Sequence, residues 1–378
     1  MTFLFKQLSK DFRVSEELPF TPTGKWDAFY VYIEKQNMTT QELIDHIRKT
    51  CNLSRMSIGI AGLKDKKAIA RQWISIYNRA LRKAWGEKVF VEALAQKVKI
   101  LETTRHTFPL NLSTPITNRF ALTFRANKHL GQGEKEHAKK EILALLQQGY
   151  PNAFGDQRFG IGGRNATQGR EILHQQSTEL AHMKKHDIIF KIQAYASQLF
   201  NEYIDTAHTS PTTTPLNGTI LTWDHQGKIM YGVYIHATQQ VQPVSLGKAA
   251  DAPKQPRYHV DMKRDTKGKV HAYDPAHMVP TWPVIGWNIP LPPAGSEAWE
   301  KEKAFITQQV GEKTIWDRLD HYRVFGLRRA VWVQPTRTEA HYHGDNLHIH
   351  FSLPSGAYAS ILFDKLQERM QHMRAPTK

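Results

Sequence analysis

Two groups of side chains in this sequence are of types that carry out chemistry, and the first surrounds a single carboxylate. Asp65 lies between Lys64 and Lys66 in the run Ala61-Gly-Leu-Lys-Asp-Lys-Lys-Ala68. Neighbouring cations keep a carboxylate ionised, and they also attract phosphates. The segment therefore indicates an anionic group beside a phosphate-binding surface, although a charged turn without a function fits the same eight residues.

The second group consists of histidines near the C-terminus. His348 and His350 share one face of a predicted strand, and His341, His343 and Asp345 precede them. An H-x-H pair with a third ligand can hold zinc, which makes a metal-dependent nuclease or phosphoesterase a candidate. No HExxH sequence and no nearby cysteine accompany the pair. We therefore favour solvent-exposed hairpin histidines and predict no metal site.

The sequence lacks the signatures of several common enzyme classes. The run Gly160-Ile-Gly-Gly163 does not have the G-x-G-x-x-G spacing of a dinucleotide site. Neither G-x-x-x-x-G-K-[ST] nor G-x-S-x-G occurs, which argues against a P-loop NTPase and an α/β-hydrolase.

The composition predicts a soluble cytoplasmic protein that binds nucleic acid. The 378 residues suffice for two domains, and 51 Lys and Arg against 35 Asp and Glu give a net charge of +16. Such a surplus is typical of chains that bind RNA or DNA. The single cysteine, Cys51, excludes a disulfide framework and a cysteine-based zinc cluster. No apolar run is long enough to cross a membrane, and the N-terminus does not resemble a signal peptide.

The elements that must position Asp65 follow from hydrophobic periodicity. A capping box at Thr39–Glu42 begins a helix, and Gly149 ends another helix over 134–148. Alternating β-branched and aromatic residues predict strands at 29–33, 56–60, 73–77 and 120–124.

The pattern of predicted elements is rich in strands up to Gly149, differs after Gly149, and becomes rich in strands again near residue 331. The intervening part contains a helix over 187–204, a basic segment at 248–269 and a proline-rich turn region at 279–293. A predicted strand at 347–353 and a helix over 359–371 then follow. This order suggests one domain interrupted by another.

Five segments, taken in order, resemble motifs of one protein family. They are Asp11-Phe-Arg-Val-Ser-Glu16, Gly62-Leu-Lys-Asp-Lys-Lys-Ala68 with Arg71-Gln-Trp73, Asn118-Arg-Phe120, Pro151-Asn-Ala-Phe-Gly-Asp-Gln-Arg-Phe-Gly160, and Leu353-Pro-Ser-Gly-Ala-Tyr-Ala-Ser360. On these motifs the sequence is similar to the tRNA pseudouridine synthase D (TruD) family over nearly its full length.

The resemblance implies an α+β fold and a reaction. It implies a pseudouridine synthase catalytic domain with a mixed, mainly antiparallel sheet, made of residues 1–149 and 331–378. A family-specific α/β insertion, the TRUD-type domain, would occupy residues 150–330. The implied reaction converts uridine to pseudouridine in tRNA, at uridine 13 of the D-arm, without a cofactor or a metal. We expect tRNA as the partner of a monomer that needs no obligate protein partner and does not bind membranes.

The resemblance also implies the catalytic groups. Asp65 would supply the carboxylate, which either adds to C1′ or removes the C2′ proton, and the sequence does not choose between these routes. Lys6 would be the partner cation of Asp65. An exposed lysine near the terminus is the alternative for Lys6.

Four further residues are expected to contact the substrate. Phe120 would stack on the flipped base, because the base loses its stacking when it leaves the RNA. Asn118 lies on the same side of the strand and would orient Asp65 or the ribose. Lys64 and Tyr358 complete the predicted binding residues. The alternatives are that Phe120 belongs to the core and that Asn118 only satisfies backbone groups.

One loop departs from the pattern of the family. The segment Phe108–Asn118 lacks the glycines that the family carries there, which bears on substrate choice more than on reaction type. A function of a different class also fits the sequence, namely a non-catalytic RNA-binding or tRNA-folding protein on the same scaffold.

Overall fold

The chain divides into two compact units in the computed structural model. Unit 1 contains residues 1–149 and 334–378, and unit 2 contains residues 150–333. The structure describes residues 3–372, except residues 6, 26, 84–85, 113, 115, 175–182, 207–213, 226–227, 246–262, 265–270 and 276. In this described part of the chain, no helix has both the length and the apolar character needed to cross a membrane.

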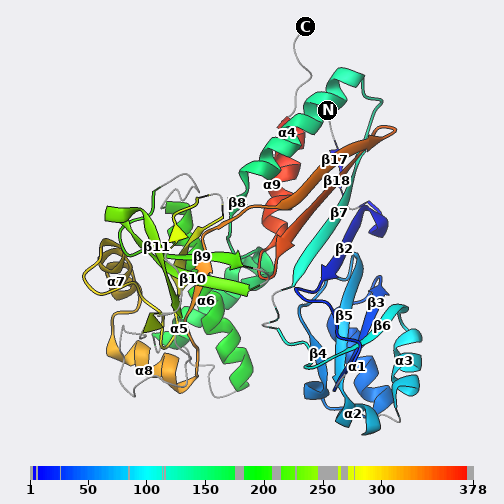
Figure 1. Ribbon diagram of the computed structural model, residues 1–378, viewed down its shortest axis with the longest axis horizontal. Helices are drawn as coiled ribbons and strands as arrows, with labels where there is room; N and C mark the ends of the chain where they lie inside the picture. Colours follow the sequence, from blue (N-terminus) through cyan, green and yellow to red (C-terminus); the bar gives the residue numbers. More distant parts are fainter. Residues whose placement is uncertain are drawn as a thin grey trace. The chain divides into compact units, whose positions relative to one another are not determined.

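Unit 1 is built on a mixed, mainly antiparallel sheet (Figure 1). Its strands run in the order β17-β18-β7-β2-β5-β3-β6, with β1 beside β7 and β4 beside β5. The pairing of β2 with β5 is parallel, and the other described pairings in this sheet are antiparallel. The strands are β1 (Phe3–Leu4), β2 (Phe12–Glu17), β3 (Ala28–Lys35), β4 (Ile58–Ile60), β5 (Ile69–Tyr77), β6 (Lys99–His106), β7 (Thr117–Ala126), β17 (Thr336–His343) and β18 (Asn346–Pro354).

The helices of unit 1 pack on different parts of this sheet. The helices of unit 1 are α1 (Thr40–Cys51), α2 (Asn78–Lys83), α3 (Glu87–Ala95), α4 (Gln132–Gln148) and α9 (Ala359–His372). Leucine and isoleucine side chains of α1 and α3 pack against β3 and β5, whose inward residues include Val31, Ile33 and Ile74. Phe363 of α9 packs against Phe12, Phe120 and Phe351 on β2, β7 and β18.

Local sequence signals set the ends of these helices. The Thr39 hydroxyl accepts a hydrogen bond from the Glu42 amide, and the Glu42 carboxylate accepts one from the Thr39 amide, which confirms the predicted capping box. Helix α4 ends at Gly149, whose φ of 77° lies in the region that favours glycine. The prediction of a strand over 56–60 is wrong for its first two residues, because Arg55–Ser57 form a short 3₁₀ turn.

Unit 2 contains a second sheet, which is accompanied by helices (Figure 1). Strands β9 (Ile220–His225), β10 (Lys228–Ile235), β11 (Gln240–Ser245), β12 (Lys263–Arg264), β13 (His271–Ala272), β14 (Val279–Val284) and β15 (Leu327–Ala330) form this sheet in the order β12-β11-β10-β9-β14-β15, with β13 beside β11. Its α-helices are α5 (Arg164–Leu173), α6 (Lys185–Thr206), α7 (Glu297–Val310) and α8 (Lys313–His321). Short strands β8 (Tyr150–Pro151) and β16 (Trp332–Val333) pair where the chain enters and leaves the unit.

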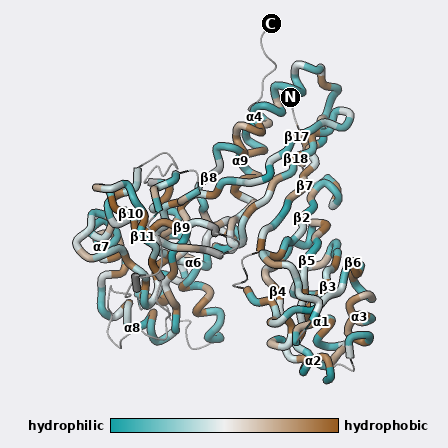
Figure 2. The backbone as a smooth tube through the Cα atoms, in the orientation of Figure 1, coloured by the Kyte–Doolittle hydropathy of each residue, from teal (hydrophilic) through white to brown (hydrophobic). Residues whose placement is uncertain are grey.

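The prediction of a proline-rich turn region over 279–293 is wrong for residues 279–284. Residues 279–284 form the strand β14 between β9 and β15 despite two prolines. Trp282 and Val284 of this strand are buried in the core of the unit, and their burial outweighs the loss of two backbone donors. Apolar segments of unit 2 are visible in the hydropathy colouring of Figure 2.

A buried ion pair lies inside unit 2. The Arg328 guanidinium donates two hydrogen bonds to the Glu302 carboxylate, at 2.5 and 2.8 Å, and both side chains are almost fully buried. Arg328 also donates to Thr281 Oγ1, to the Thr281 carbonyl and to the Pro290 carbonyl. One arginine therefore joins β14, β15 and α7.

Together these features confirm the predicted α+β fold with a mixed, mainly antiparallel sheet, which lies in unit 1.

Candidate active site

Asp65 lies in the loop of residues 61–68 that joins β4 to β5. The two strands pair antiparallel, with Ile60 opposite Ile74, so β5 begins five residues beyond the end of β4 and the loop bridges this offset. The Asp65 side chain is exposed. An exposed carboxylate acts at a defined place only if its main chain is fixed, and three sets of contacts fix this loop.

The first set comes from Lys35, the last residue of β3. Its ammonium is buried and donates hydrogen bonds to the carbonyls of Met38 at 2.6 Å, Lys64 at 3.2 Å and Asp65 at 2.9 Å. Three donors thus meet three backbone acceptors, two of them in the loop. Burial lowers the pKa of Lys35 to about 8, and the charge of Asp65 opposes this effect.

The second set is a buried ion pair between the loop and β2. The Lys64 ammonium contacts the Glu16 carboxylate, and their side chains are 7% and 0% exposed. The other oxygen of Glu16 accepts a hydrogen bond from the Trp73 amide of β5 at 2.9 Å. Burial raises the pKa of the Glu16 carboxyl, whereas Lys64 and the Trp73 amide lower it. Glu16 therefore links β2, β5 and the loop.

The third set starts at the beginning of α1. The Thr40 hydroxyl accepts a hydrogen bond from the Lys64 amide at 2.9 Å and donates one to Gln72 Oε1 at 2.8 Å. Thr40 and Gln72 are both buried. The loop is therefore attached to β2, β3, β5 and α1 by side chains that lie far apart in the sequence.

Sequence reasoning did not single out Lys35, Glu16, Thr40 or Gln72 for these contacts. For Lys35 a signal existed, because Val31, Ile33 and Lys35 alternate on one side of β3, and a lysine at a buried position needs acceptors. Glu16 belongs to one of the family motifs, but the sequence alone did not indicate a role for it. Its contact with Lys64 depends on the pairing of β2 with β5, which the sequence does not specify.

The buried lysine leads to a prediction about pH. Below about pH 8 the folded and unfolded chains both hold the Lys35 proton, whereas between about 8 and 10.5 only the unfolded chain does. Stability contributed by Lys35 therefore rises with pH in this window. We therefore expect the wild type to become more stable relative to Lys35→Met as the pH rises from 8 to 10. The unfolding free energy of the wild type should gain up to roughly 3 kcal/mol over that of the variant.

Urea denaturation at several pH values measures this difference. Lys66→Met is the matched control, since the Lys66 side chain is 56% exposed in its ion pair with Glu42. A Lys35→Met difference that stays constant over this pH range would contradict the titration of a buried lysine.

Phe120 and Asn118 lie on one side of β7, as predicted from their spacing. The Phe120 ring is 7% exposed and stacks with Phe351 at 5.2 Å between ring centroids and with Phe12 at 6.2 Å. Asn118 pairs in register with Glu16 on β2. Its Oδ1 is buried and has no hydrogen-bond partner among the residues that the structure describes. The sheet therefore brings Asn118 beside the strand position of Glu16, whose carboxylate holds Lys64.

The two remaining predicted residues stand at the ends of the chain. Tyr358 is half-buried directly before α9, and its carbonyl accepts a hydrogen bond from the Ile361 amide. Lys6 lies outside the described residues.

The histidine cluster lies on the strands β17 and β18. The rings of His341 and His348 stack at 5.3 Å between centroids, and the ring of His350 lies 5.4 Å from that of His341. His348 contacts the Thr123 hydroxyl at 3.2 Å. Within the described ranges, no group of three or more His, Cys, Asp or Glu is arranged to hold a metal ion.

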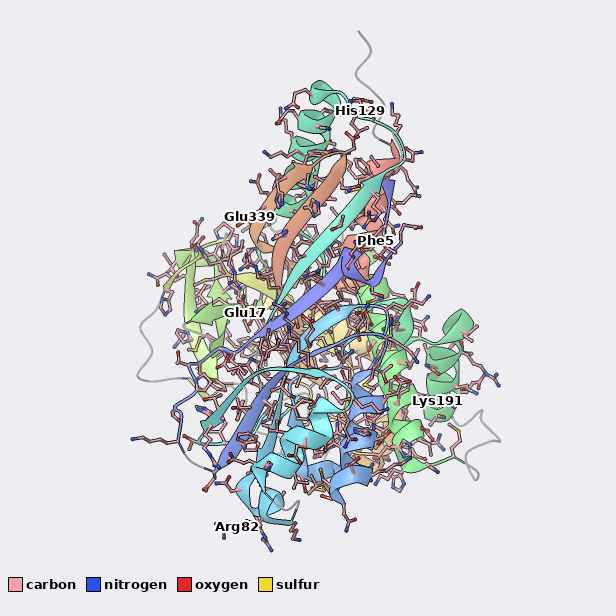
Figure 3. The ribbon with its side chains drawn as sticks, turned by 90° about the vertical axis from the view of Figure 1, so that its right-hand side faces the viewer. Phe5, Glu17, Arg82, His129, Lys191 and Glu339 are labelled. Carbon is pink, nitrogen blue, oxygen red and sulfur yellow. The ribbon has the colours of Figure 1, made fainter. Side chains whose placement is uncertain are left out.

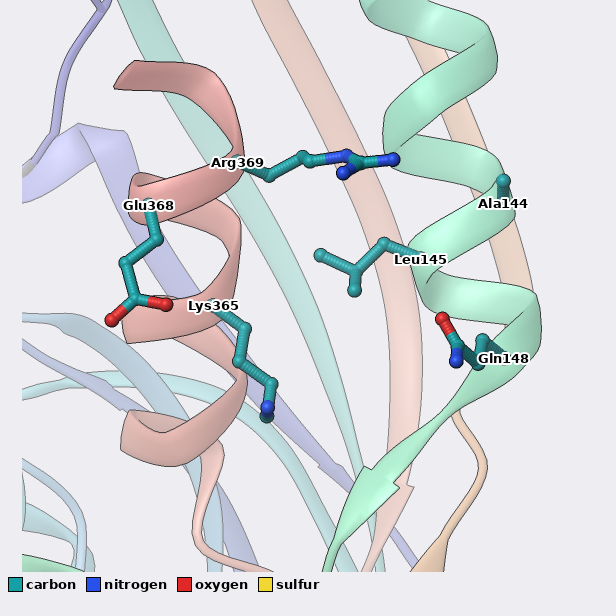
Figure 4. A pocket seen from close by; sticks show the side chains of 6 residues that line it. All are labelled: Ala144, Leu145, Gln148, Lys365, Glu368 and Arg369. Carbon is teal, nitrogen blue, oxygen red and sulfur yellow. The ribbon is translucent and has the colours of Figure 1, made fainter. Parts of the chain in front are cut away.

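A groove between α4 and α9 is separate from the Asp65 loop. Its volume is about 360 Å³, and Leu145, Gln148, Lys365 and Glu368 are among the residues that line it (Figure 4). Arg369 extends across it toward α4 and forms an ion pair with Glu141 (Figure 4). None of the predicted site residues lines this groove.

The known proteins that this chain resembles share one description. The sequence profile of the tRNA pseudouridine synthase D (TruD) family matches residues 2–185. A tRNA pseudouridine synthase D of Wolinella succinogenes is 28% identical over 376 residues, which are 97% of this chain and 95% of the relative. One from Thermus thermophilus is 26% identical over 97% of this chain and 89% of the relative.

A solved structure shares the fold. The crystal structure of the putative tRNA pseudouridine synthase D from Methanosarcina mazei superposes with a TM-score of 0.58 at 17% identity, over 98% of this chain and 94% of the other.

The family profile and the relatives that match along the whole chain define an isomerase of the pseudouridine synthase class. The chain is similar to members of the tRNA pseudouridine synthase D (TruD) family along nearly its whole length, which confirms the predicted resemblance.

Proposed function

We propose that this enzyme isomerises uridine 13 in the D-arm of tRNA with the carboxylate of Asp65 and without a cofactor. The observation that carries the proposal is the anchoring of the Asp65 loop. An exposed carboxylate sits on a main chain that a buried lysine, a buried ion pair and a buried threonine hold in place. Such preorganisation is what a reactive group needs in order to act at one atom of a bound substrate.

The proposed reaction breaks one bond to C1′ and forms another. The bond from C1′ to N1 of uracil breaks and N1 keeps the electron pair, the base turns, and C1′ joins C5. C5 then loses its proton to solvent, and N1 takes up a proton in return. Asp65 acts either by adding to C1′ or by taking the C2′ proton, which returns at the end of the cycle. Because the product is an isomer of the substrate, no oxidant, reductant or second substrate is consumed.

We propose supporting roles for the other predicted residues. Lys6 would be the partner cation of Asp65 when tRNA is bound. Lys64 already pairs with Glu16, so we assign it to positioning the loop in addition to its predicted contact with substrate. Tyr358 would contribute an aromatic surface near the base.

Asn118 and Phe120 would face the ribose and the base. The buried Oδ1 of Asn118 without a partner among the described residues supports a polar contact with substrate. Because Phe12 and Phe351 cover most of the Phe120 ring, we propose that this ring contacts the uracil through its small exposed part.

We also propose that unit 2 is the TRUD-type insertion of the family, and that the enzyme acts as a cytoplasmic monomer with tRNA as its partner. The boundaries of the compact unit, 150–333, support the first of these proposals.

Tritium release from tRNA that carries 5-³H-uridine tests the reaction, with and without EDTA. We expect release in both conditions, and mapping of the product to position 13. Release that depends on a metal would overturn the cofactor-free proposal. Tight tRNA binding without release would favour the non-catalytic RNA-binding function instead.

The basic segment 248–269 gives a separate prediction. It holds seven Lys or Arg against three Asp, and apart from residues 263–264 it lies outside the described residues. We expect that replacing it with a short Gly-Ser linker weakens tRNA binding and flattens its salt dependence, because fewer counterions are released. The rate at saturating tRNA should stay unchanged. An unchanged salt slope would show that the segment does not contact RNA.

A further inference from the structure

A second pocket of unit 1 lies at the end of β5 that is opposite to the Asp65 loop. Its volume is about 830 Å³, and it is formed by the end of β5, by α2, by the turn before β4 and by the loop after β6. Strand β5 runs from Ile69 to Tyr77, and at about 3.3 Å per residue its two ends lie roughly 25 Å apart. The pocket is therefore too distant to share one nucleotide with Asp65.

Three cations line this pocket, namely Arg79, Arg82 and Lys83. All three side chains are exposed, and the described part of the chain provides no ion pair or hydrogen bond for any of them. Figure 3 shows Arg82 extending outward at the α2 end of unit 1. Asp27 is the one acidic residue in the lining. The pocket therefore attracts anions, and its cations are available to a ligand.

Large apolar side chains lie beside these cations. Tyr77 is 47% exposed, Phe108 is 53% exposed and Met56 is 91% exposed, and all three line the pocket. Exposed aromatic rings next to arginines form the combination that binds unpaired nucleotides, because bases stack on the rings while the cations contact the phosphates.

The aromatic part of the pocket is rigid. The Phe108 carbonyl accepts a hydrogen bond from the Tyr30 hydroxyl at 2.8 Å, and the Leu110 amide donates one to Ser75 Oγ at 2.8 Å. A Cβ on Gly59 would lie 2.3 Å from the Leu110 carbonyl oxygen, so the loop packs directly on the backbone of β4. The first residues of the loop after β6, up to Leu110, are thus fixed before any ligand binds, which reduces the entropy lost on binding.

The ring of Phe108 is also oriented in advance. It meets the His106 ring edge-on at 4.6 Å and the Phe20 ring at 5.9 Å, and still keeps about half of its surface exposed. A ring supported on one side and open on the other can serve as a stacking surface.

We propose that this pocket is an accessory RNA site that binds an unpaired nucleotide of the tRNA other than the uridine that is modified. The inference rests on the proposed function, since it assumes that tRNA is the substrate. The site adds affinity and selects RNAs that place a second unpaired nucleotide roughly 25 Å from the target. It also gives a role to the loop after β6, whose sequence departs from the pattern of the family.

Binding of an unmodified tRNA transcript at several salt concentrations tests the charged part of the site. We expect the double variant Arg79→Gln/Arg82→Gln to weaken binding by about tenfold or more and to lower the salt slope by nearly two. The rate at saturating tRNA should stay within about twofold of the wild type. Lys97→Gln is the control for charge alone, because Lys97 is exposed in the turn after α3 and does not line the pocket.

Phe108→Ala tests stacking separately from charge. We expect it to weaken tRNA binding about tenfold with an unchanged salt slope. Met56→Ala, at a 91% exposed position, provides a second variant that the fold tolerates if Phe108→Ala unfolds. For Met56→Ala we expect at least a threefold loss of affinity.

A short stem-loop that carries only the target uridine completes the test. We expect the pocket variants to bind this stem-loop as the wild type does, because it does not reach the pocket. Affinities for full-length tRNA within twofold of the wild type in all pocket variants would overturn the inference, as would an equal loss in Lys97→Gln. If the pocket variants kept the wild-type affinity and the wild type released tritium, the accessory site would be ruled out and the proposed function would stand. No tRNA binding by the wild type would overturn both proposals.

Discussion

Asp65→Asn should lower the rate of tritium release by at least about a thousandfold while tRNA affinity changes by no more than a few-fold. The substitution removes one negative charge and keeps the shape of the side chain. Because the Lys35 ammonium and the Thr40 hydroxyl hold the main chain of the loop, the loop should keep its position. The measurement is single-turnover release with enzyme in excess, together with a binding titration of the same tRNA.

A matched control makes the same chemical change elsewhere. Asp45 lies on α1 with 45% of its side chain exposed, so Asp45→Asn should leave both rate and affinity close to those of the wild type. If Asp65→Asn abolished tRNA binding, Asp65 would be a structural residue of the loop. If it retained the wild-type rate, another group would carry out the chemistry.

Glu302→Ala should lower the free energy of unfolding of unit 2 by about 3–5 kcal/mol. The variant leaves the Arg328 guanidinium buried without its carboxylate, and the remaining acceptors, Thr281 and Pro290, are neutral. Removal of one partner of a buried pair costs more than the pair contributes, because the remaining charge is taken out of water without compensation.

Tryptophan fluorescence during urea denaturation can follow this effect, since six of the nine tryptophans lie in residues 150–333. Glu300→Ala serves as the control on the same helix, because Glu300 is exposed and its loss should cost less than about 0.5 kcal/mol. A loss below about 1 kcal/mol for Glu302→Ala would mean that water reaches Arg328 and replaces the carboxylate.

Elements with strong local signals were predictable from the sequence. The capping box at Thr39 begins α1, and Gly149 ends α4, because each signal depends on residues within one or two turns. The prediction of a strand over 56–60 was wrong for its first two residues, and the reason is equally local. The hydroxyls of Ser54 and Ser57 contact each other at 2.8 Å and support a 3₁₀ turn that competes with the strand.

The support of the site was much less predictable than its central residue. Asp65 was found as part of a motif. The contacts that hold it join residues 24 to 48 positions apart, as in Lys64 with Thr40 and Lys64 with Glu16. Such contacts depend on which strands pair and in which direction, and hydrophobic periodicity does not specify that. The burial of Phe120 between Phe12 and Phe351 likewise follows from the register of three strands.

The pairing of β8 with β16 has a consequence for how this enzyme can change over evolution. Residues 150–151 and 332–333 are hydrogen-bonded neighbours, so unit 2 begins and ends at points about one strand spacing apart. On the side of unit 1, the Gln334 side chain donates to the Gln147 carbonyl, so its two chain ends also meet. An insertion with adjacent ends can be exchanged, enlarged or shortened without moving the strands on either side. Homologues can therefore diverge by replacement of a whole module, while the strands that border the Asp65 loop remain as they are.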